Sequence, residues 1–141
     1  MKMLKVLAIA VGAYLALVVA FESLVGLMGK QEAEHGVEPG EHWLVIQTTG
    51  ADGQPRKTVI GGVENEGHLY VCANHWPRGW YHRAIEHPDV EITSAGETRP
   101  YLVVPVGGKE REHIAAVYPL PWIVRFLSGF PPRSFVRLDP R

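Results

Sequence analysis

The stretch from Lys57 to Ile92 decides the fold, and it reads KTVIGGVENEGHLYVCANHWPRGWYHRAIEHPDVEI. Two runs of β-branched and aromatic residues, 58–60 and 68–73, are separated by turn-forming residues, which is typical of a β-hairpin. A short helix is predicted for Trp80 to Glu86. Pro88 ends it, because the residue before a proline avoids the α region, and an alternating strand follows. The stretch therefore predicts strand, tight turn, strand, loop, short helix and strand.

Three further strands are predicted outside this stretch, at 43–49, 98–106 and 134–138, together with a helix at 109–118. Pro100 and Pro105 favour an edge position or a bulge for the second of these strands. Six short strands and small helices predict a mainly β, antiparallel barrel.

An apolar run precedes this domain, from Val6 to Leu27, with Glu22 near its far end. At a rise of ~1.5 Å per residue, the run spans roughly 33 Å, which is enough to cross a bilayer. A cleaved signal peptide led by Lys2 and Lys5 is the alternative, but the run continues beyond the usual length of such a peptide. The two lysines favour an amino terminus in the cytoplasm and an extracytoplasmic domain.

The chain of 141 residues is accordingly divided into three parts. A transmembrane anchor is expected at 1–29, a polar linker at 30–41 and a single β-barrel domain at 42–141. The one cysteine, Cys72, excludes an internal disulfide and is expected to be an inert, buried thiol. A net charge of −1 without a basic stripe argues against nucleic acid as a partner.

A second apolar segment, Trp122 to Leu127, lies near the carboxyl end. Trp122, Phe126 and Phe130 are spaced for one face of a helix. This helix is expected either to pack on the barrel or to dip into the membrane interface beside the anchor.

Candidate functional residues gather in the loop at 74–83, which mixes large rings with cations and suits a planar or anionic ligand. Arg56 and Lys57 follow a glycine-rich turn and could bind phosphate, with a solvated strand end as the alternative. Four of the seven histidines lie in or near this stretch, and they do not show a familiar metal-ligand spacing, so no metal site is predicted. They are His68, His75, His82 and His87.

The order of these motifs resembles the deazaflavin (F-420)-dependent nitroreductase and quinone reductase family, within the split β-barrel flavin-binding superfamily. The similar stretches cover the whole domain and are Thr48-Thr49-Gly50, 53–56, 67–73, Trp80-Tyr81-His82, 87–90 and 133–140. The resemblance implies a split β-barrel oxidoreductase that transfers a hydride from the deazaflavin coenzyme F-420, or from FMN, to a quinone or nitro-aromatic acceptor.

The resemblance also implies a set of cofactor-binding positions. Arg56 and Lys57 would bind phosphates; the ring edge would meet Ala73, Asn74 and His75; and packing at the loop would come from Trp80 and Tyr81. The chain departs from the family pattern at Asp52, which places an acid near the phosphates. It also departs at Arg83, which either replaces a lost cation or points to solvent.

The expected partners follow from the apolar amino-terminal run and from the family resemblance. They are the lipid bilayer and a quinone-type small molecule, with a homodimer or a membrane complex as the assembly. A barrel without cofactor, serving as an accessory subunit of a membrane complex, is the alternative function.

Overall fold

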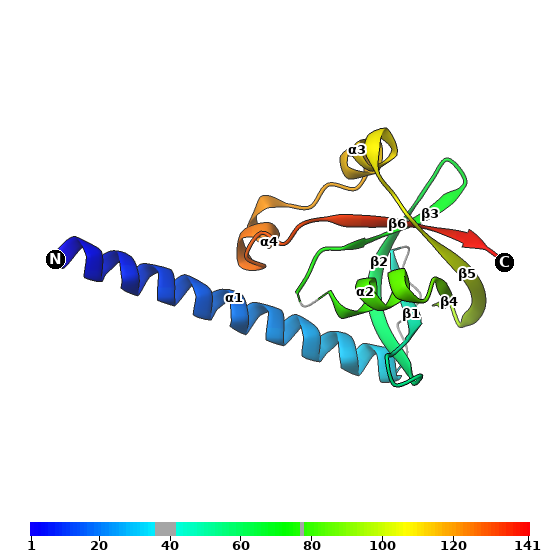
Figure 1. Ribbon diagram of the computed structural model, residues 1–141, viewed down its shortest axis with the longest axis horizontal. Helices are drawn as coiled ribbons and strands as arrows, with labels where there is room; N and C mark the ends of the chain where they lie inside the picture. The colour runs from blue at the N-terminus through cyan, green and yellow to red at the C-terminus, as the bar shows by residue number, and fades with distance from the viewer. Residues whose placement is uncertain (36–41, 77) are drawn as a thin grey trace.

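The computed structural model describes residues 1–35, 42–76 and 78–141. Residues 36–41 of the predicted linker, and Pro77 of the predicted ligand loop, lie outside the described residues. The elements, in chain order, are α1 (Lys2–His35), β1 (Trp43–Thr49), β2 (Pro55–Asn65), β3 (His68–Ala73), α2 (Gly79–Glu86), β4 (Asp89–Ser94), β5 (Glu97–Pro105), α3 (Gly108–Val117), α4 (Trp122–Leu127) and β6 (Ser134–Pro140) (Figure 1).

The six strands form a closed antiparallel barrel, as the strand patterns predicted. Their order around the barrel is β1-β2-β3-β6-β5-β4. The hairpin at its centre pairs β2 with β3 and closes over two residues, Glu66 and Gly67. Both have positive φ, 51° and 79°, which a tight hairpin turn between twisted strands requires. The predicted turn was therefore correctly placed but is shorter than expected.

The barrel interior is filled by alternate residues of every strand, which is the period-two pattern of a half-buried sheet. Two residues of α2, Trp80 and Ala84, join the same core, so this helix packs directly against the barrel interior. The strand residues of the core are Leu44, Ile46, Ile60, Val71, Ala73, Val90, Ile92, Val103, Val136 and Leu138.

The expectation that Pro100 and Pro105 mark an edge strand is wrong, because β5 lies between β4 and β6 in the closed barrel. Each proline instead pairs on one side only. Pro100 lies opposite Glu91 of β4, and Pro105 lies opposite Val136 of β6. The two ladders along β5 are staggered, so a residue without an N–H group is tolerated where one of them has ended.

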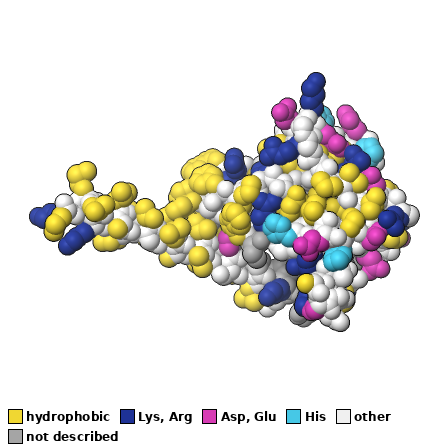
Figure 2. Space-filling model, in the orientation of Figure 1, with side chains coloured by type: hydrophobic (Ala, Val, Ile, Leu, Met, Phe, Trp, Pro, Cys, Tyr) yellow, Lys and Arg dark blue, Asp and Glu magenta, His cyan; other side chains and the backbone are white. Residues whose placement is uncertain are grey.

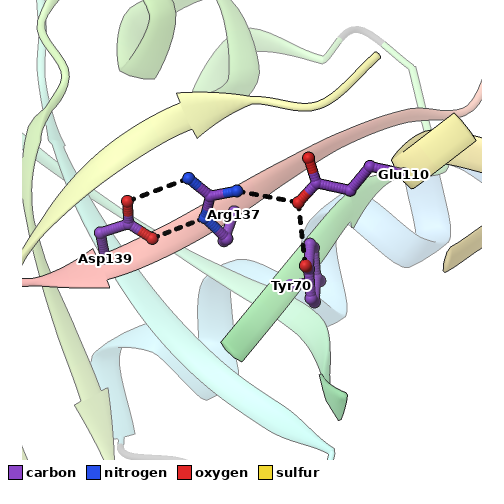
Figure 3. A network of polar contacts seen from close by, with 4 residues as sticks. All are labelled: Tyr70, Glu110, Arg137 and Asp139. Carbon is purple, nitrogen blue, oxygen red and sulfur yellow. Dashed lines mark hydrogen bonds and ion pairs between the residues drawn. The ribbon is translucent and has the colours of Figure 1, made fainter. Parts of the chain in front are cut away.

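Helix α3 covers the outer face of the barrel, where its residue Ile114 is fully buried against Phe135 of β6. A polar network fastens the helix at its first turn (Figure 3). The Glu110 Oε1 atom accepts hydrogen bonds from the Tyr70 hydroxyl and from Arg137 Nη1, both at 2.9 Å. Arg137 also donates to Asp139 at 2.7 Å, so one guanidinium joins two carboxylates.

This network predicts a pH-dependent contribution to stability. Hydrogen bonds from Tyr70 and Arg137 lower the pKa of the Glu110 carboxyl below its usual value. The ionised Glu110 carboxylate therefore stabilises the fold fully above the ordinary carboxyl pKa. This stabilisation is lost as the pH falls through the lowered pKa. We expect Glu110→Gln to reduce the free energy of unfolding at neutral pH by about 1 kcal/mol, since the site is partly exposed.

Urea unfolding at neutral pH and at about pH 3 measures this effect. The difference between the wild type and Glu110→Gln should shrink at the lower pH. Glu112→Gln, an exposed change on the same helix, serves as the control and should have little effect at either pH. A difference for Glu110→Gln that stays constant with pH would contradict the prediction.

Helix α1 is 34 residues long and continues to His35, into the segment predicted as a linker. Its part Lys2–Gln31 contains an 18-residue window with a mean hydropathy of 2.4 and is long enough to cross a membrane. The amino-terminal end projects away from the barrel, and α4 lies beside the middle of the helix (Figure 1). Apolar side chains cover the projecting end and continue onto the region of α4 (Figure 2).

Helix α4 has the bounds of the predicted apolar segment, but Phe130, expected on the same helical face, lies beyond its end. The helix ends at Leu127, and the backbone turns at Gly129 and Phe130, which both have positive φ. The rings of Trp122, Phe126 and Phe130 still lie in a row. The centroid of Phe126 is 6.2 Å from each of the other two, and the rings meet edge-to-face.

Candidate functional site

Two arginine side chains, Arg56 and Arg83, lie where β1 ends and β2 begins. Helix α2, which carries Arg83, packs across this place. The Arg83 side chain of α2 donates from Nε to the hydroxyl of Thr48 at 2.8 Å, and Thr48 is 1% exposed. The same hydroxyl lies 3.4 Å from the carbonyl oxygen of Arg56. Arg83 is therefore held beside the start of β2 and does not simply point to solvent. That it replaces a lost cation of the family pattern stays a prediction.

The acid predicted near this position is in contact with one of the cations. Asp52 Oδ2 accepts a hydrogen bond from Arg56 Nη2 at 2.7 Å, and the Asp52 Oδ1 atom accepts from the Gln54 backbone N–H at 3.1 Å. Gly50 leaves room for this arrangement, because a Cβ atom there would stand 2.6 Å from Asp52 Oδ1. Asp52 thus closes the turn and forms an exposed ion pair with Arg56.

Arg83, in contrast, has no carboxylate partner among the described residues. Burial lowers the pKa of its guanidinium, and the positive charge of Arg56 lowers it further. Two arginines against one aspartate leave this part of the surface with a surplus positive charge. Guanidinium groups and a neighbouring hydroxyl are the donors that a phosphate or carboxylate prefers.

Lys57 does not join this group. It is exposed, and it follows Arg56 directly in a strand, where successive side chains point to opposite faces. The structure therefore brings together Arg56 and Arg83 but not Arg56 and Lys57. The phosphate-binding role of Lys57 stays a prediction.

The residues predicted at the ring edge lie at the end of β3 and in the loop that follows. Ala73 is buried and pairs with Ser134 of β6. The Asn74 Oδ1 atom accepts hydrogen bonds from Cys72 Sγ at 2.8 Å and from Arg133 Nε at 3.1 Å. Cys72 is 5% exposed, and burial raises the pKa of its thiol to about 11, as expected of an inert cysteine.

His75 is held by the long helix. Its Nδ1 atom lies 3.0 Å from Glu22 Oε1, and the other Glu22 oxygen accepts the backbone N–H of Trp76 at 2.9 Å. The hydroxyl of Ser128, just after α4, lies 3.4 Å from the same His75 atom. The Glu22 side chain is only 9% exposed, so these contacts explain how a carboxylate is accommodated in an apolar helix.

The two predicted packing residues have different surroundings. Trp80 is in the barrel core, whereas Tyr81 is half-buried and meets Trp80 edge-to-face at 6.0 Å. The guanidinium of Arg78 lies 5.1 Å over the Tyr81 ring, which is a cation–π contact. Of the two, Tyr81 is the one with a surface that a ligand can reach.

Arg78 is one of the cations of the predicted loop at 74–83, but nothing in the sequence singled it out as a binding residue. It is 7% exposed, has a φ of 63° just before α2, and donates to the Pro132 carbonyl at 2.9 Å and the Ser134 hydroxyl at 2.5 Å. Its buried Nε has no hydrogen-bond partner among the described residues. A buried cation that is only partly satisfied, beside the predicted ring-binding loop, favours an anionic or carbonyl-bearing ligand nearby.

Two other residues around the loop were also missed. Arg133 falls within the late motif 133–140, but its contact with Asn74 depends on β6 pairing with β3. Glu22 was noticed as a carboxylate near the end of an apolar run, yet nothing local connects it to His75. Both contacts join residues more than fifty positions apart.

Comparison with known proteins gives one family. The model of the family described as "F420H(2)-dependent quinone reductase" matches residues 24–122. A comparison with curated proteins gives no match.

Solved structures share the fold at low sequence identity. An F420-H2 dependent reductase (FDR-A) has 21% identity and a TM-score of 0.55, covering 74% of this chain and all of that one (100%). A structure described as a domain-swapped dimer has 17% identity and a TM-score of 0.57, covering 80% and 91%. HutZ, a heme storage protein from Vibrio cholerae, has 18% identity and a TM-score of 0.51, covering 72% and 82%.

Proposed function

Since the chain belongs to the F420H(2)-dependent quinone reductase family, we propose that it is a membrane-anchored oxidoreductase that passes a hydride from deazaflavin coenzyme F-420 to a quinone. The observation that carries the proposal is the half-buried Arg83 beside Arg56, at the place where the predicted phosphate site begins. Arg83 has no carboxylate partner in the part of the chain that the structure describes. FMN, the other predicted cofactor, has no support from the family, so the deazaflavin is preferred.

The residues present fit such a coenzyme. Arg83 and Arg56 would hold an anionic phosphate tail, since both present guanidinium groups and only one is neutralised by Asp52. Asn74, His75 and Tyr81 would line the ring, with Ala73 leaving a small buried wall at the end of β3. When bound, the coenzyme supplies the hydride; the protein orients the ring and excludes water.

The membrane anchor is the second part of the proposal. The apolar length of α1 supports it, and a signal sequence would show the same property. We propose the anchor at 1–29, the linker at 30–41 and the reductase domain at 42–141, with the domain extracytoplasmic. A lipid-soluble quinone would then be available in the bilayer that holds the enzyme.

Titration of the full chain in mild detergent with coenzyme F-420, and separately with FMN, tests the cofactor. We expect saturable binding of F-420 and weaker or no binding of FMN. Oxidation of the reduced coenzyme on addition of a short-chain quinone tests the reaction. A folded chain that binds neither cofactor would overturn the proposal and favour the alternative of a non-catalytic subunit of a membrane complex.

Replacing Asp52 is expected to strengthen coenzyme binding, whereas replacing an arginine of the site would weaken it. Asp52→Asn keeps an oxygen for the Gln54 N–H but removes the charge that pairs with Arg56. We expect binding of F-420 to become tighter by about three- to fivefold, because a surface ion pair of about 1 kcal/mol no longer competes with the anion.

The measurement is the same titration at low and high salt, since screening should reduce the gain. Glu97→Gln, which breaks the exposed ion pair with Arg99 in β5, is the matched control and should leave binding unchanged. Weaker binding by Asp52→Asn would show that Arg56 does not face the coenzyme.

A further inference from the structure

Helix α1 docks against the barrel along only part of its length. All residues from Met1 to Ala13 are exposed. From Tyr14 onward, residues spaced three or four apart are half-buried, which marks a single face of the helix. They are Tyr14, Val18, Phe21, Glu22, Val25, Gly29 and Ala33. The helix is therefore fixed to the domain well before its apolar run ends.

The docking contacts attach the helix to α4 and to the ligand loop. The Tyr14 hydroxyl donates to the Phe126 carbonyl at 2.9 Å, and their rings lie 4.8 Å apart. Val18 packs on Gly129, where a Cβ atom would stand 2.9 Å from Val18 Cγ1. About one turn beyond Val18, Glu22 holds the loop at His75. The order of these contacts sets the depth of each part of the barrel relative to a membrane crossed by α1.

The free part of α1 is too short to cross a bilayer alone. Thirteen residues, Met1 to Ala13, span about 20 Å, whereas the hydrocarbon layer is about 30 Å thick. The distance from Lys2 to Glu22 is about 30 Å, so the charged residues at both ends match the layer when Glu22 lies at its boundary. Tyr14 and Val18 then lie within the hydrocarbon, and the parts of α4 that touch them must lie there too.

The outward surface of α4 suits that position. Its exposed residues are large and apolar: Trp122 is 71% exposed, Ile123 46% and Phe130 53%. This surface is continuous with the exposed apolar surface of α1 (Figure 2). The sequence carries no acidic residue between Glu112 and Asp139. The exposed cation nearby, Arg125, has its guanidinium 5.8 Å over the Phe130 ring and can reach lipid phosphates along its apolar stem.

We propose that the segment from Trp122 to Phe130 inserts into the membrane leaflet nearest the barrel, beside α1, with lipid acyl chains covering its exposed face. The inference rests on the membrane anchor of the proposed function and is independent of the reductase activity. It places α4 about 10 Å below the level of Glu22. His75 and Trp76 then lie at the headgroup level.

This arrangement gives the acceptor a route. His75, proposed to line the coenzyme ring, lies at the junction of α1 and α4, in contact with Glu22 and Ser128. A quinone dissolved in the acyl layer would approach the ring from the membrane side, between the two helices. The acceptor would not have to leave the bilayer through water.

Tryptophan quenching by brominated lipids tests the insertion. The full chain is reconstituted in phosphatidylcholine and phosphatidylglycerol vesicles that carry bromine deep in the acyl chains or near the headgroups. We expect deep bromine to quench the protein fluorescence strongly, and we expect most of that quenching to be absent in Trp122→Phe. Trp43→Phe, which removes an exposed tryptophan of the barrel, should retain it.

Extraction of the same vesicles at alkaline pH distinguishes membrane anchoring by α1 from insertion of α4. A chain that stays in the membrane, with quenching equal in the wild type and Trp122→Phe, would overturn insertion of α4 while leaving the anchor intact. Cross-linking between chains through α4 in that case would identify a second copy as the cover. A chain released into solution would overturn the anchor, and with it the basis of this inference.

Discussion

Replacing Arg83 by glutamine is expected to weaken binding of coenzyme F-420 by about thirtyfold. The change removes a half-buried guanidinium that has no carboxylate partner among the described residues. A hydrogen bond to a charged group contributes about 2 kcal/mol, which corresponds to that loss of affinity. Titration of the coenzyme into the full chain in detergent measures it, with a thermal melt to verify that the variant is folded.

Two further variants make the result specific. Arg83→Lys keeps the charge but not the planar fork, so an intermediate affinity is expected. Arg99→Gln removes an arginine that is 69% exposed and already paired with Glu97, and it should bind the coenzyme as the wild type does. Equal affinities for all three variants would show that Arg83 serves only to hold Thr48 in place.

Phe135→Ala is expected to lower the free energy of unfolding by about 4 kcal/mol. Phe135 is 2% exposed and lies between the outer face of the barrel and α3, in contact with Ile114, and the Arg133 guanidinium covers its ring at 4.9 Å. A cavity there cannot close easily, because the barrel backbone on one side is fixed by two ladders.

Urea unfolding in mild detergent, followed by tryptophan fluorescence, measures this loss. Phe135→Leu should lose less than half as much, because it leaves a smaller cavity. Val117→Ala on α3, which is 41% exposed, should change the stability by less than about 0.5 kcal/mol. If Phe135→Ala were no more destabilised than Val117→Ala, the outer cluster would not contribute to folding.

The fold was predictable because its signals are local. Alternating apolar residues indicate each strand, and the residues around Gly67 indicate the hairpin. Pro88 places the end of α2. The order of the strands around the barrel was not predicted, because pairing between distant strands leaves no local pattern. The prolines of β5 were misread because a stagger between two ladders leaves no mark on a single strand.

The site was predictable only in part, because side-chain direction and long-range contacts decide it. The adjacent residues Arg56 and Lys57 were predicted to bind phosphate together, but successive side chains of a strand point to opposite faces. The second cation near Arg56 comes from α2, where Arg83 reaches Thr48 across 35 positions of sequence. The partners of Asn74 and His75 come from β6 and α1, which no local pattern could identify.

The buried thiol of Cys72 has a chemical consequence for an enzyme of this kind. A quinone is an electrophile as well as an oxidant, and a thiolate near its path would add to the ring and stay attached. With a pKa of about 11 and 5% exposure, Cys72 stays protonated and covered at neutral pH. The only thiol in the chain is thus protected from alkylation by the quinone proposed as the acceptor.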